Sequence, residues 1–502
     1  MGAGRPYYHR HLIKRMKHLN DILTSIVGTS LLLGACNQHY PSIEYDEPEQ
    51  IANSELYDKT PLMVFVNKQD FFHITATRGT GAFDLDGSEK FKNSTFHVFA
   101  FRNNRYTGTT LSEDVDLTKS IHLNGQLIPE FNEDGTEGAS RADCLLDGPD
   151  SRLGMPTKLS ADNSGELRTV VQSEGADVPT LLYYSSRYQD VGYNFFGYHI
   201  DDFDYTATGV CHRQNDAIYY DLTIDGSQDI LCGYAPELTP QVLSDQYGNL
   251  GVTSADKAKI LNIGAYSTFA AHRDLHPVIS MKHMLARLRF VAHPGDEQAK
   301  NIVIRSLEVQ CPNKGRLTVA HRDLSKIGFE VDATSSARLP LCEGSADGIE
   351  KSGALQPVNV SYTDDMEGII WHQRPGQRVG ESLLLPQAEE YKLFLTYDQS
   401  IQQPVLDRNG QRQFDADGNL IARTVTHRAT AEYNLRLSEG EVSADSPSYD
   451  PVSGKCIFKS GYAYTIHIGV YGLQEIKVSA NIDGWMEGEE INLDPDDPTV
   501  SD

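Results

Sequence analysis

The chain has 502 residues, of which 39% are hydrophobic, and its formal charge at pH 7 is −26. This length exceeds one ordinary hydrophobic core and predicts two domains or more. The acidic excess argues against a nucleic-acid-binding protein, because contacts with phosphate require a basic face. The hydrophobic content is ordinary for a folded protein in water, so we do not expect the main part of the chain to lie within a membrane.

The N-terminal segment has the order of features found in a secretory leader. Basic residues within 10–17 precede an apolar run over 22–33, and Gly34-Ala35-Cys36 follows. The apolar run is too short to span a bilayer, which needs roughly 20 residues. Small residues before a cysteine resemble the lipobox of bacterial lipoproteins, where the thiol is acylated and becomes the mature N-terminus.

We therefore predict a signal peptide over residues 1–35, with Met16 as an alternative start, and lipidation at Cys36. Residues 36–60 are polar and acidic, which predicts a flexible lipidated tether. Two or three acyl chains would anchor the protein stably, since each buried CH₂ contributes about 0.8 kcal/mol.

From residue 61 onward, short apolar runs alternate with turn residues, and helical periodicity is nearly absent. The expected strands are 62–66, 71–74, 96–101, 181–184, 193–200, 218–224, 285–291, 302–309, 383–386, 391–397, 462–471 and 476–478. One helix is expected over Ser254 to Ile263, and an exposed hairpin tip over 407–419. This pattern predicts an all-β fold with two β-sandwich domains, over 61–255 and 256–502.

The sequence contains no complete catalytic or metal-binding motif among those that its residues suggest. The segments 272–275 and 321–324 both spell His-Arg-Asp-Leu, but neither has the asparagine that a kinase loop needs five residues after the aspartate. Residues 415–419 resemble the start of a calcium loop but lack its closing glutamate, so a hairpin turn explains them better. His272 and His276 have metal-ligand spacing, yet Pro277 follows at once. We predict no enzymatic activity, no cofactor and no metal.

The cysteines and the aromatic clusters leave alternatives open. Six cysteines besides Cys36 form no C-x-x-C pair, so they are either partly disulfide-bonded or free and buried, and no pairing is assigned. The aromatic residues over 183–198 could form a sugar-stacking platform, but filling a core is the favoured interpretation.

A set of short segments follows in a fixed order along the chain: Ala76-Thr77-Arg78-Gly79, 96–101, 193–198, 221–231, 282–290, 384–387 and Trp485. With a lipobox in front, this order resembles the fimbrillin family of Bacteroidales, which includes Mfa-like proteins and type V pilins. The resemblance implies two tandem transthyretin-like β-sandwich domains. It also implies a structural or accessory subunit of surface fimbriae that supports adhesion at the outer membrane.

The family further implies assembly by strand exchange after an arginine-specific cut. Removal of an N-terminal strand opens a groove, and a strand from the next subunit fills it. Arg78 is the only arginine between Cys36 and Arg102, so it is the candidate processing site, with residues 62–77 filling the groove beforehand. The alternative is that Arg78 is a turn residue before Gly79.

Expected partners are other fimbrial subunits, the outer membrane through the lipid anchor, and a host or bacterial surface receptor, with no nucleic acid among them. The alternative function is a surface glycan-binding lipoprotein without catalytic activity.

Overall fold

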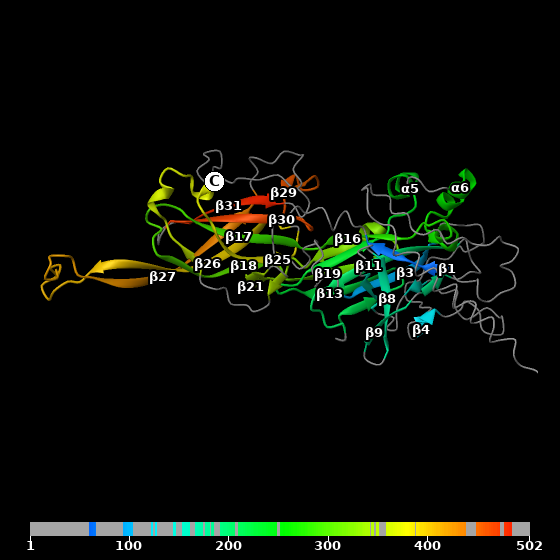
Figure 1. Ribbon diagram of the computed structural model, residues 1–502, viewed down its shortest axis with the longest axis horizontal. Coiled ribbons are helices and arrows are strands. Elements are labelled where there is room, and N and C mark those ends of the chain that lie inside the picture. Colours follow the sequence, from blue (N-terminus) through cyan, green and yellow to red (C-terminus); the bar gives the residue numbers. More distant parts are fainter. Residues whose placement is uncertain are drawn as a thin grey trace, which may run out of the picture. The chain divides into compact units, whose positions relative to one another are not determined.

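Figure 1 shows the computed structural model of the chain. The structure describes residues 60–66, 94–103, 122–123, 126–127, 144–146, 153–160, 166–173, 176–180, 182–184, 191–205, 209–247, 252–341, 343–345, 348–350, 358–386, 388–437, 448–471 and 476–483.

One sheet closes on itself around a first hydrophobic core. Its strands are β2 (Val64–Val66), β3 (Phe96–Asn103), β6 (Cys144–Leu146), β7 (Met155–Leu159), β8 (Glu166–Ser173), β9 (Ala176–Thr180), β11 (Gly192–Ile200), β14 (Ile230–Tyr234), β15 (Tyr266–Ser267) and β16 (Val278–His283). The pairing runs β11-β14-β16-β2-β8-β7-β3, and β3 pairs with β11 again. Buried apolar side chains such as Val64, Phe195 and Ile279 belong to this core.

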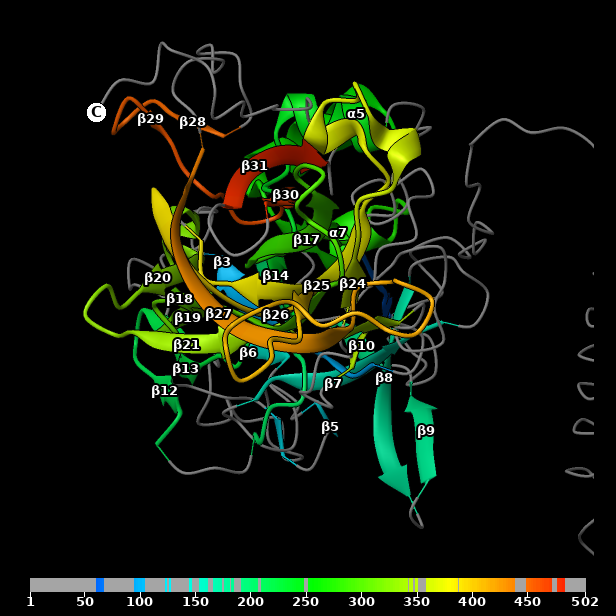
Figure 2. The ribbon, with the colours of Figure 1, turned by 90° about the vertical axis from the view of Figure 1, so that its left-hand side faces the viewer.

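Two further sheets share a second core. The first has the order β25 (Gln377–Leu384), β17 (Ala286–Pro294), β30 (Ala463–Val470) and β31 (Ile476–Asp483). The second has the order β21 (Ala337–Pro340), β18 (Ile302–Cys311), β26 (Glu390–Pro404) and β27 (Ala422–Arg436), with β24 (Val358–Val360) also paired to β18. Figure 2 shows β30 and β31 on one side and β26 and β27 on the other. Leu288, Ile466 and Leu395 belong to the cluster between them.

A fourth sheet joins segments that are far apart in sequence. It consists of β12 (Cys211–Arg213), β13 (Ala217–Thr223), β19 (Lys314–His321) and β20 (Gly328–Val331), in that order. The remaining strands form isolated pairs: β1 (Thr60–Leu62) with β10 (Leu182–Tyr184), β4 (His122–Leu123) with β5 (Gln126–Leu127), β22 (Glu343–Ser345) with β23 (Gly348–Glu350), and β28 (Tyr449–Asp450) with β29 (Lys455–Cys456).

Helices are few and short in the described part. They are α5 (Pro240–Tyr247), α6 (Ser254–Ile263), α7 (Thr268–Ala271) and the 3-10 turns η1 (Leu324–Lys326), η2 (Asp364–Met366) and η3 (Trp371–Gln373). α6 matches the predicted helix, because the Thr253 hydroxyl accepts the N–H of Asp256 at its start and Gly264 ends it at φ +68°. α5 was not predicted. None of the described helices is long and apolar enough to cross a membrane.

The all-β prediction is confirmed. The predicted strand 193–200 corresponds to β11, and within the predicted strand 462–471 the side chains of Tyr464, Ile466 and Ile468 are buried on one face. Strand 391–397 is longer than predicted, because β26 continues to Pro404. The predicted strand 71–74 lies outside the described residues.

The predicted division near residue 255 stays a prediction. Residues 51–502 form one compact unit. Strands from both sides of residue 255 pair with one another: β16 pairs with β14, and β13 pairs with β19.

Candidate functional site

The two site residues predicted from the sequence, Cys36 and Arg78, lie outside the described residues. Lipidation of Cys36 and cleavage after Arg78 therefore remain predictions. The strand that precedes Arg78 in sequence is described, and it occupies a distinctive position.

β2 is a three-residue strand inserted between two others. It runs parallel to β16, with Phe65 opposite Val278, and antiparallel to β8, with Val64 opposite Leu167. The N–H of Phe65 also donates to the carbonyl of Pro277 over 2.9 Å. All three residues of β2 are buried, so this short segment completes both the backbone pairing and the apolar core of the first sheet.

Two histidine side chains pack beside β1 and β2 and are themselves partly or fully buried. The imidazole of His276 lies 6.0 Å from the ring of Phe65, and burial lowers the pKa of His276 to about 4. Before β2, the hydroxyl of Thr60 lies 2.5 Å from Nε2 of His272. His272 and His276 thus serve the packing around β1 and β2, and burial lowers the pKa of His272 as well.

β16, the strand that pairs with β2, approaches β14 closely on its other side, and this close approach depends on a glycine. A Cβ at Gly233 would fall 1.9 Å from the carbonyl oxygen of Ser280. No larger residue fits there without separating the strands, so this glycine holds the strand against which β2 pairs.

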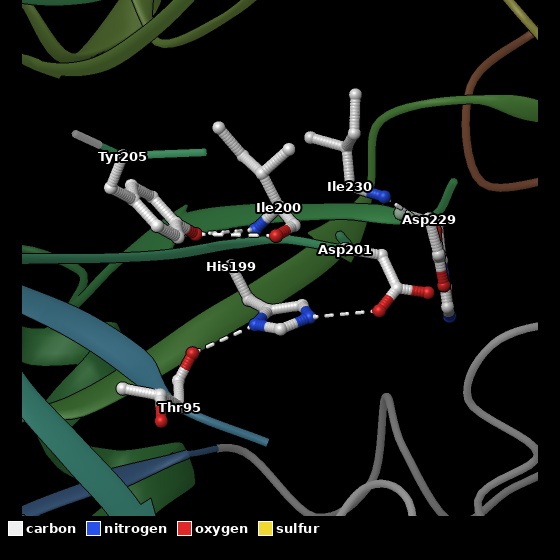
Figure 3. Close-up of polar contacts among 8 residues, drawn as sticks. Thr95, His199, Ile200, Asp201, Tyr205, Asp229 and Ile230 are labelled. Carbon is white, nitrogen blue, oxygen red and sulfur yellow. Dashed lines mark hydrogen bonds and ion pairs between the residues drawn. The ribbon is translucent and has the colours of Figure 1, made fainter. Parts of the chain in front are cut away.

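Two buried histidine–carboxylate pairs lie at the ends of β11, β14 and β16. Figure 3 shows the first pair, His199 with Asp201. His199 Nδ1 is 2.7 Å from the carbonyl oxygen of Thr95, and its Nε2 is 3.7 Å from Asp201. Asp229 is fully buried, accepts the N–H of Ile230, and lies 2.8 Å from Nδ1 of His283. The sequence did not predict these pairs: His199 and Asp201 are only two residues apart but match no motif, and Asp229 and His283 are 54 residues apart.

A third buried histidine is neutral. The His97 ring stacks on Tyr198 with centroids 5.3 Å apart and also contacts Tyr205. Burial, together with the nearby His199, lowers the pKa of His97 to about 4. His97 therefore contributes to the packed interior rather than to an accessible acid–base centre.

The sequence motifs set aside above have structural roles. Arg273 pairs with Asp256 over 2.7 Å, and the Asp323 carboxylate accepts the N–H of Ser325 at the start of η1. Asp415 accepts two N–H groups of its own turn, which confirms the hairpin interpretation. Among the described residues, no group of three or more His, Cys, Asp or Glu is arranged to hold a metal ion.

The described aromatic residues of 183–198 fill the core, as favoured above. Tyr184, Tyr193, Phe195 and Phe196 are all buried. In the described part of the chain, no disulfide is formed by the cysteines whose side chains are described, which are Cys211, Cys232, Cys311 and Cys456.

A fully buried ion pair was also missed from the sequence. In β17, Arg287 and Arg289 alternate with apolar residues, a pattern typical of a strand with one face toward solvent. Arg287 is nevertheless completely buried, and its guanidinium donates from Nε to Glu381 over 3.0 Å. Arg378 binds the other oxygen of the same carboxylate over 2.8 Å.

No protein-family model matches the chain, and no curated protein matches it. Solved structures do. One is a candidate cell adhesion protein of Bacteroides uniformis, with a TM-score of 0.36 and 10% identity, covering 86% of this chain and 100% of that one. Another is the tip fimbrial protein Mfa3 of Porphyromonas gingivalis, with a TM-score of 0.29 and 10% identity, covering 85% of this chain and 100% of that one.

A fimbrilin of Porphyromonas gingivalis, FimA, matches with a TM-score of 0.27 and 10% identity, covering 86% of this chain and 99% of that one. The chain is similar, over most of its length, to Bacteroidales adhesion proteins and Porphyromonas fimbrial proteins.

Proposed function

We propose that the chain is a non-enzymatic surface lipoprotein that serves as a structural or accessory subunit of fimbriae and supports adhesion. The signal and lipobox before Cys36 would deliver it to the outer membrane. A cut after Arg78 would then release it from the lipid. Other subunits would join it by strand addition, and a surface receptor on host or bacterial cells would be its adhesion target.

One observation carries this proposal: the position of β2. The strand lies between β16 and β8, is only three residues long, and ends twelve residues before Arg78 in the sequence. Removing it would leave two unpaired strand edges and an open place in the apolar core. Unpaired edges beside exposed apolar surface bind a foreign strand readily. The glycan-binding alternative has less support, because the described aromatic residues that suggested it are buried.

The first experiment tests processing in cells that export the chain. N-terminal sequencing of surface-shed protein is expected to give a start at Gly79, and Arg78→Lys is expected to abolish this product. Arg102→Lys is the matched control, since Arg102 is the next arginine along the chain. A start at Cys36 in every pool would contradict cleavage.

The second experiment tests strand addition on the purified chain. After cleavage with an arginine-specific protease, a labelled peptide of residues 60–70 is expected to bind, whereas the uncut chain is not expected to bind it. The same peptide with Val64→Asp is the control, because a carboxylate in the core position of Val64 is expected to prevent insertion. Equal binding to cut and uncut chain would argue against a vacated groove.

A further inference from the structure

A hairpin arm extends from the second core. The last residue of β26 that pairs with β18 is Gln399, opposite Ile302. Residues 400–426, here called the arm, continue beyond this point as a two-stranded ribbon of β26 and β27 (Figure 1). Within the described part, β27 pairs only with β26. Among the described strands, none pairs with either edge of the arm, and such edges are prone to association unless another chain covers them.

The end of the arm is held in a defined conformation by backbone hydrogen bonds. Three backbone hydrogen bonds form a ring: Val405 N–H donates to Ile421 over 2.8 Å, Ile421 N–H to Gln413 over 2.9 Å, and Gln413 N–H to Val405 over 2.9 Å. Such a ring fixes the three segments of the tip relative to one another.

The same turn occurs twice at this tip. In the first, Asp407 Oδ1 accepts the N–H groups of Asn409 and Gln411, each over 2.8 Å. In the second, Asp415 Oδ1 accepts the N–H groups of Asp417 and Asn419, over 3.0 and 2.8 Å. Both turns rely on a glycine at positive φ, near +79° and +83°. These hydrogen bonds make the tip rigid, and they engage the carboxylates of Asp407 and Asp415 within the tip itself.

This rigid tip presents apolar side chains to solvent. Leu406 is 55% exposed, Phe414 58%, Leu420 40% and Ile421 37%. They are four of the seven large hydrophobic residues that are exposed in the described part of the chain. Apolar side chains gathered at the end of an ordered projection indicate a contact surface.

Three arginines belong to the same segment as the apolar side chains of the tip. Arg408, Arg412 and Arg423 are all exposed. With three arginines and three aspartates, the arm has no net charge, whereas the whole chain has a formal charge of −26. Two of the three aspartates, Asp407 and Asp415, accept N–H groups within their own turns. The arginines are therefore the charges that the tip offers to a partner, and an apolar surface flanked by acidic residues complements them.

The chain itself carries such a surface at residues 363–370, here called the acidic patch. Ile369 and Ile370 are 37% and 53% exposed, and they follow the exposed acids Asp364, Asp365 and Glu367. The patch is anchored from beneath, because Met366 and Trp371 are buried.

The acidic patch lies beside the base of the arm, since residues 299–301 contact both. Tyr362 N–H donates to Ala299 over 2.9 Å, and Lys300 Nζ lies 4.0 Å from Asp364. Ser400 N–H, where the arm begins, donates to Asn301 over 3.1 Å. An arm cannot place its own tip on a patch at its own base, but a second copy can.

We propose that two copies of the chain exchange arms, each tip docking on the acidic patch of the other. Because tip and patch lie at opposite ends of one arm, the two arms run antiparallel, and one two-fold axis satisfies both contacts. The same arrangement places the unpaired edges of the arms side by side. This contact is separate from β2, so it does not depend on cleavage or strand addition.

The test is the mass of the chain in solution, by sedimentation velocity at tens of micromolar. Every protein carries Cys36→Ser, so that lipid does not drive association. The arm-reversed variant has Arg408→Glu, Arg412→Glu and Arg423→Glu. The patch-reversed variant has Asp364→Lys, Asp365→Lys and Glu367→Lys. We expect the background protein to be a dimer and each reversed variant to be a monomer.

An equimolar mixture of the two variants is expected to restore the dimer, because both contacts then join opposite charges. Restoration also shows that both variants are folded. Val452→Asp, at an exposed residue outside both surfaces, is the control and should remain dimeric. A monomeric background protein, dimeric reversed variants, a monomeric mixture or assemblies larger than two would each overturn the proposal.

Discussion

The strand β2 and the arm differ in what holds them in place. β2 has three residues, all buried, between two other strands. β26 and β27 have 15 residues each and pair along their whole length, yet most of β27 is at least partly exposed. β2 has few backbone bonds and depends on its side chains filling a core. The arm depends on its own ladder and turns, so it can present side chains outward. A strand of the first kind can be exchanged, whereas one of the second kind can act as a rigid contact element.

Replacing an apolar residue by aspartate should destabilise the chain strongly in β2 and only slightly in the arm. Val64→Asp would bury an unpaired carboxylate in the first core, where Val64 is 3% exposed. We expect it to cost roughly 4 kcal/mol of unfolding free energy. Phe414→Asp at the arm tip should cost less than about 0.5 kcal/mol. Urea unfolding of dilute protein, at concentrations that keep copies apart, measures both.

Hydrogen exchange locates the effect. With Val64→Asp, the amides of β8 and β16 should lose protection, because these strands flank β2. Equal urea midpoints for the two variants would mean that β2 does not contribute to the cooperative core, which would remove the difference between the two regions.

The sequence predicts strands well where one face repeats every second residue, as in Tyr464, Ile466 and Ile468. It also predicts α6, because a capping threonine and a terminal glycine bound it. It does not predict that Arg287 is buried, since only the distant Glu381 makes this tolerable. The sequence also does not predict that β2 lies between two other strands. Val64-Phe65-Val66 is recognisable as an apolar strand, but the strands that pair with it are 100 and more than 200 residues away in the sequence.

Lowering the pH from 6.5 to 4 should weaken the core around His97. Burial holds this histidine neutral by lowering its pKa from 6.5 to about 4. Between these pH values the unfolded chain binds a proton that the folded chain does not, so stability is complete above pH 6.5 and falls as the pH drops toward 4. The loss attributable to His97 is about 3 kcal/mol.

The variant His97→Phe should flatten this dependence. We expect the difference in unfolding free energy between pH 7 and pH 4 to shrink relative to the unmodified chain. Some dependence should persist, because burial also lowers the pKa of His276 and His293 to about 4. An unchanged pH profile would show that His97 has the same pKa in the folded and the unfolded chain, which would contradict the effect of burial.

At the base of the arm the dependence should appear at lower pH and be smaller. Asp398 Oδ1 accepts from Arg428 and its Oδ2 from Arg305, each over 2.8 Å, which joins β26 to β27 and β18. Arg428 and Arg305 lower the pKa of Asp398 from 3.8 to about 2. Its contribution to stability is therefore present above pH 3.8 and is lost as the pH falls through 2.

Asp398→Asn should reduce the exchange protection of amides at 400–404 near neutral pH, and the difference from the unmodified chain should vanish near pH 2. A difference that persists below pH 2 would show that the side-chain shape, and not the charge, fixes the base of the arm. If the arm loosens only in this lower window, the two regions respond to pH separately, because the groups that titrate in each are different.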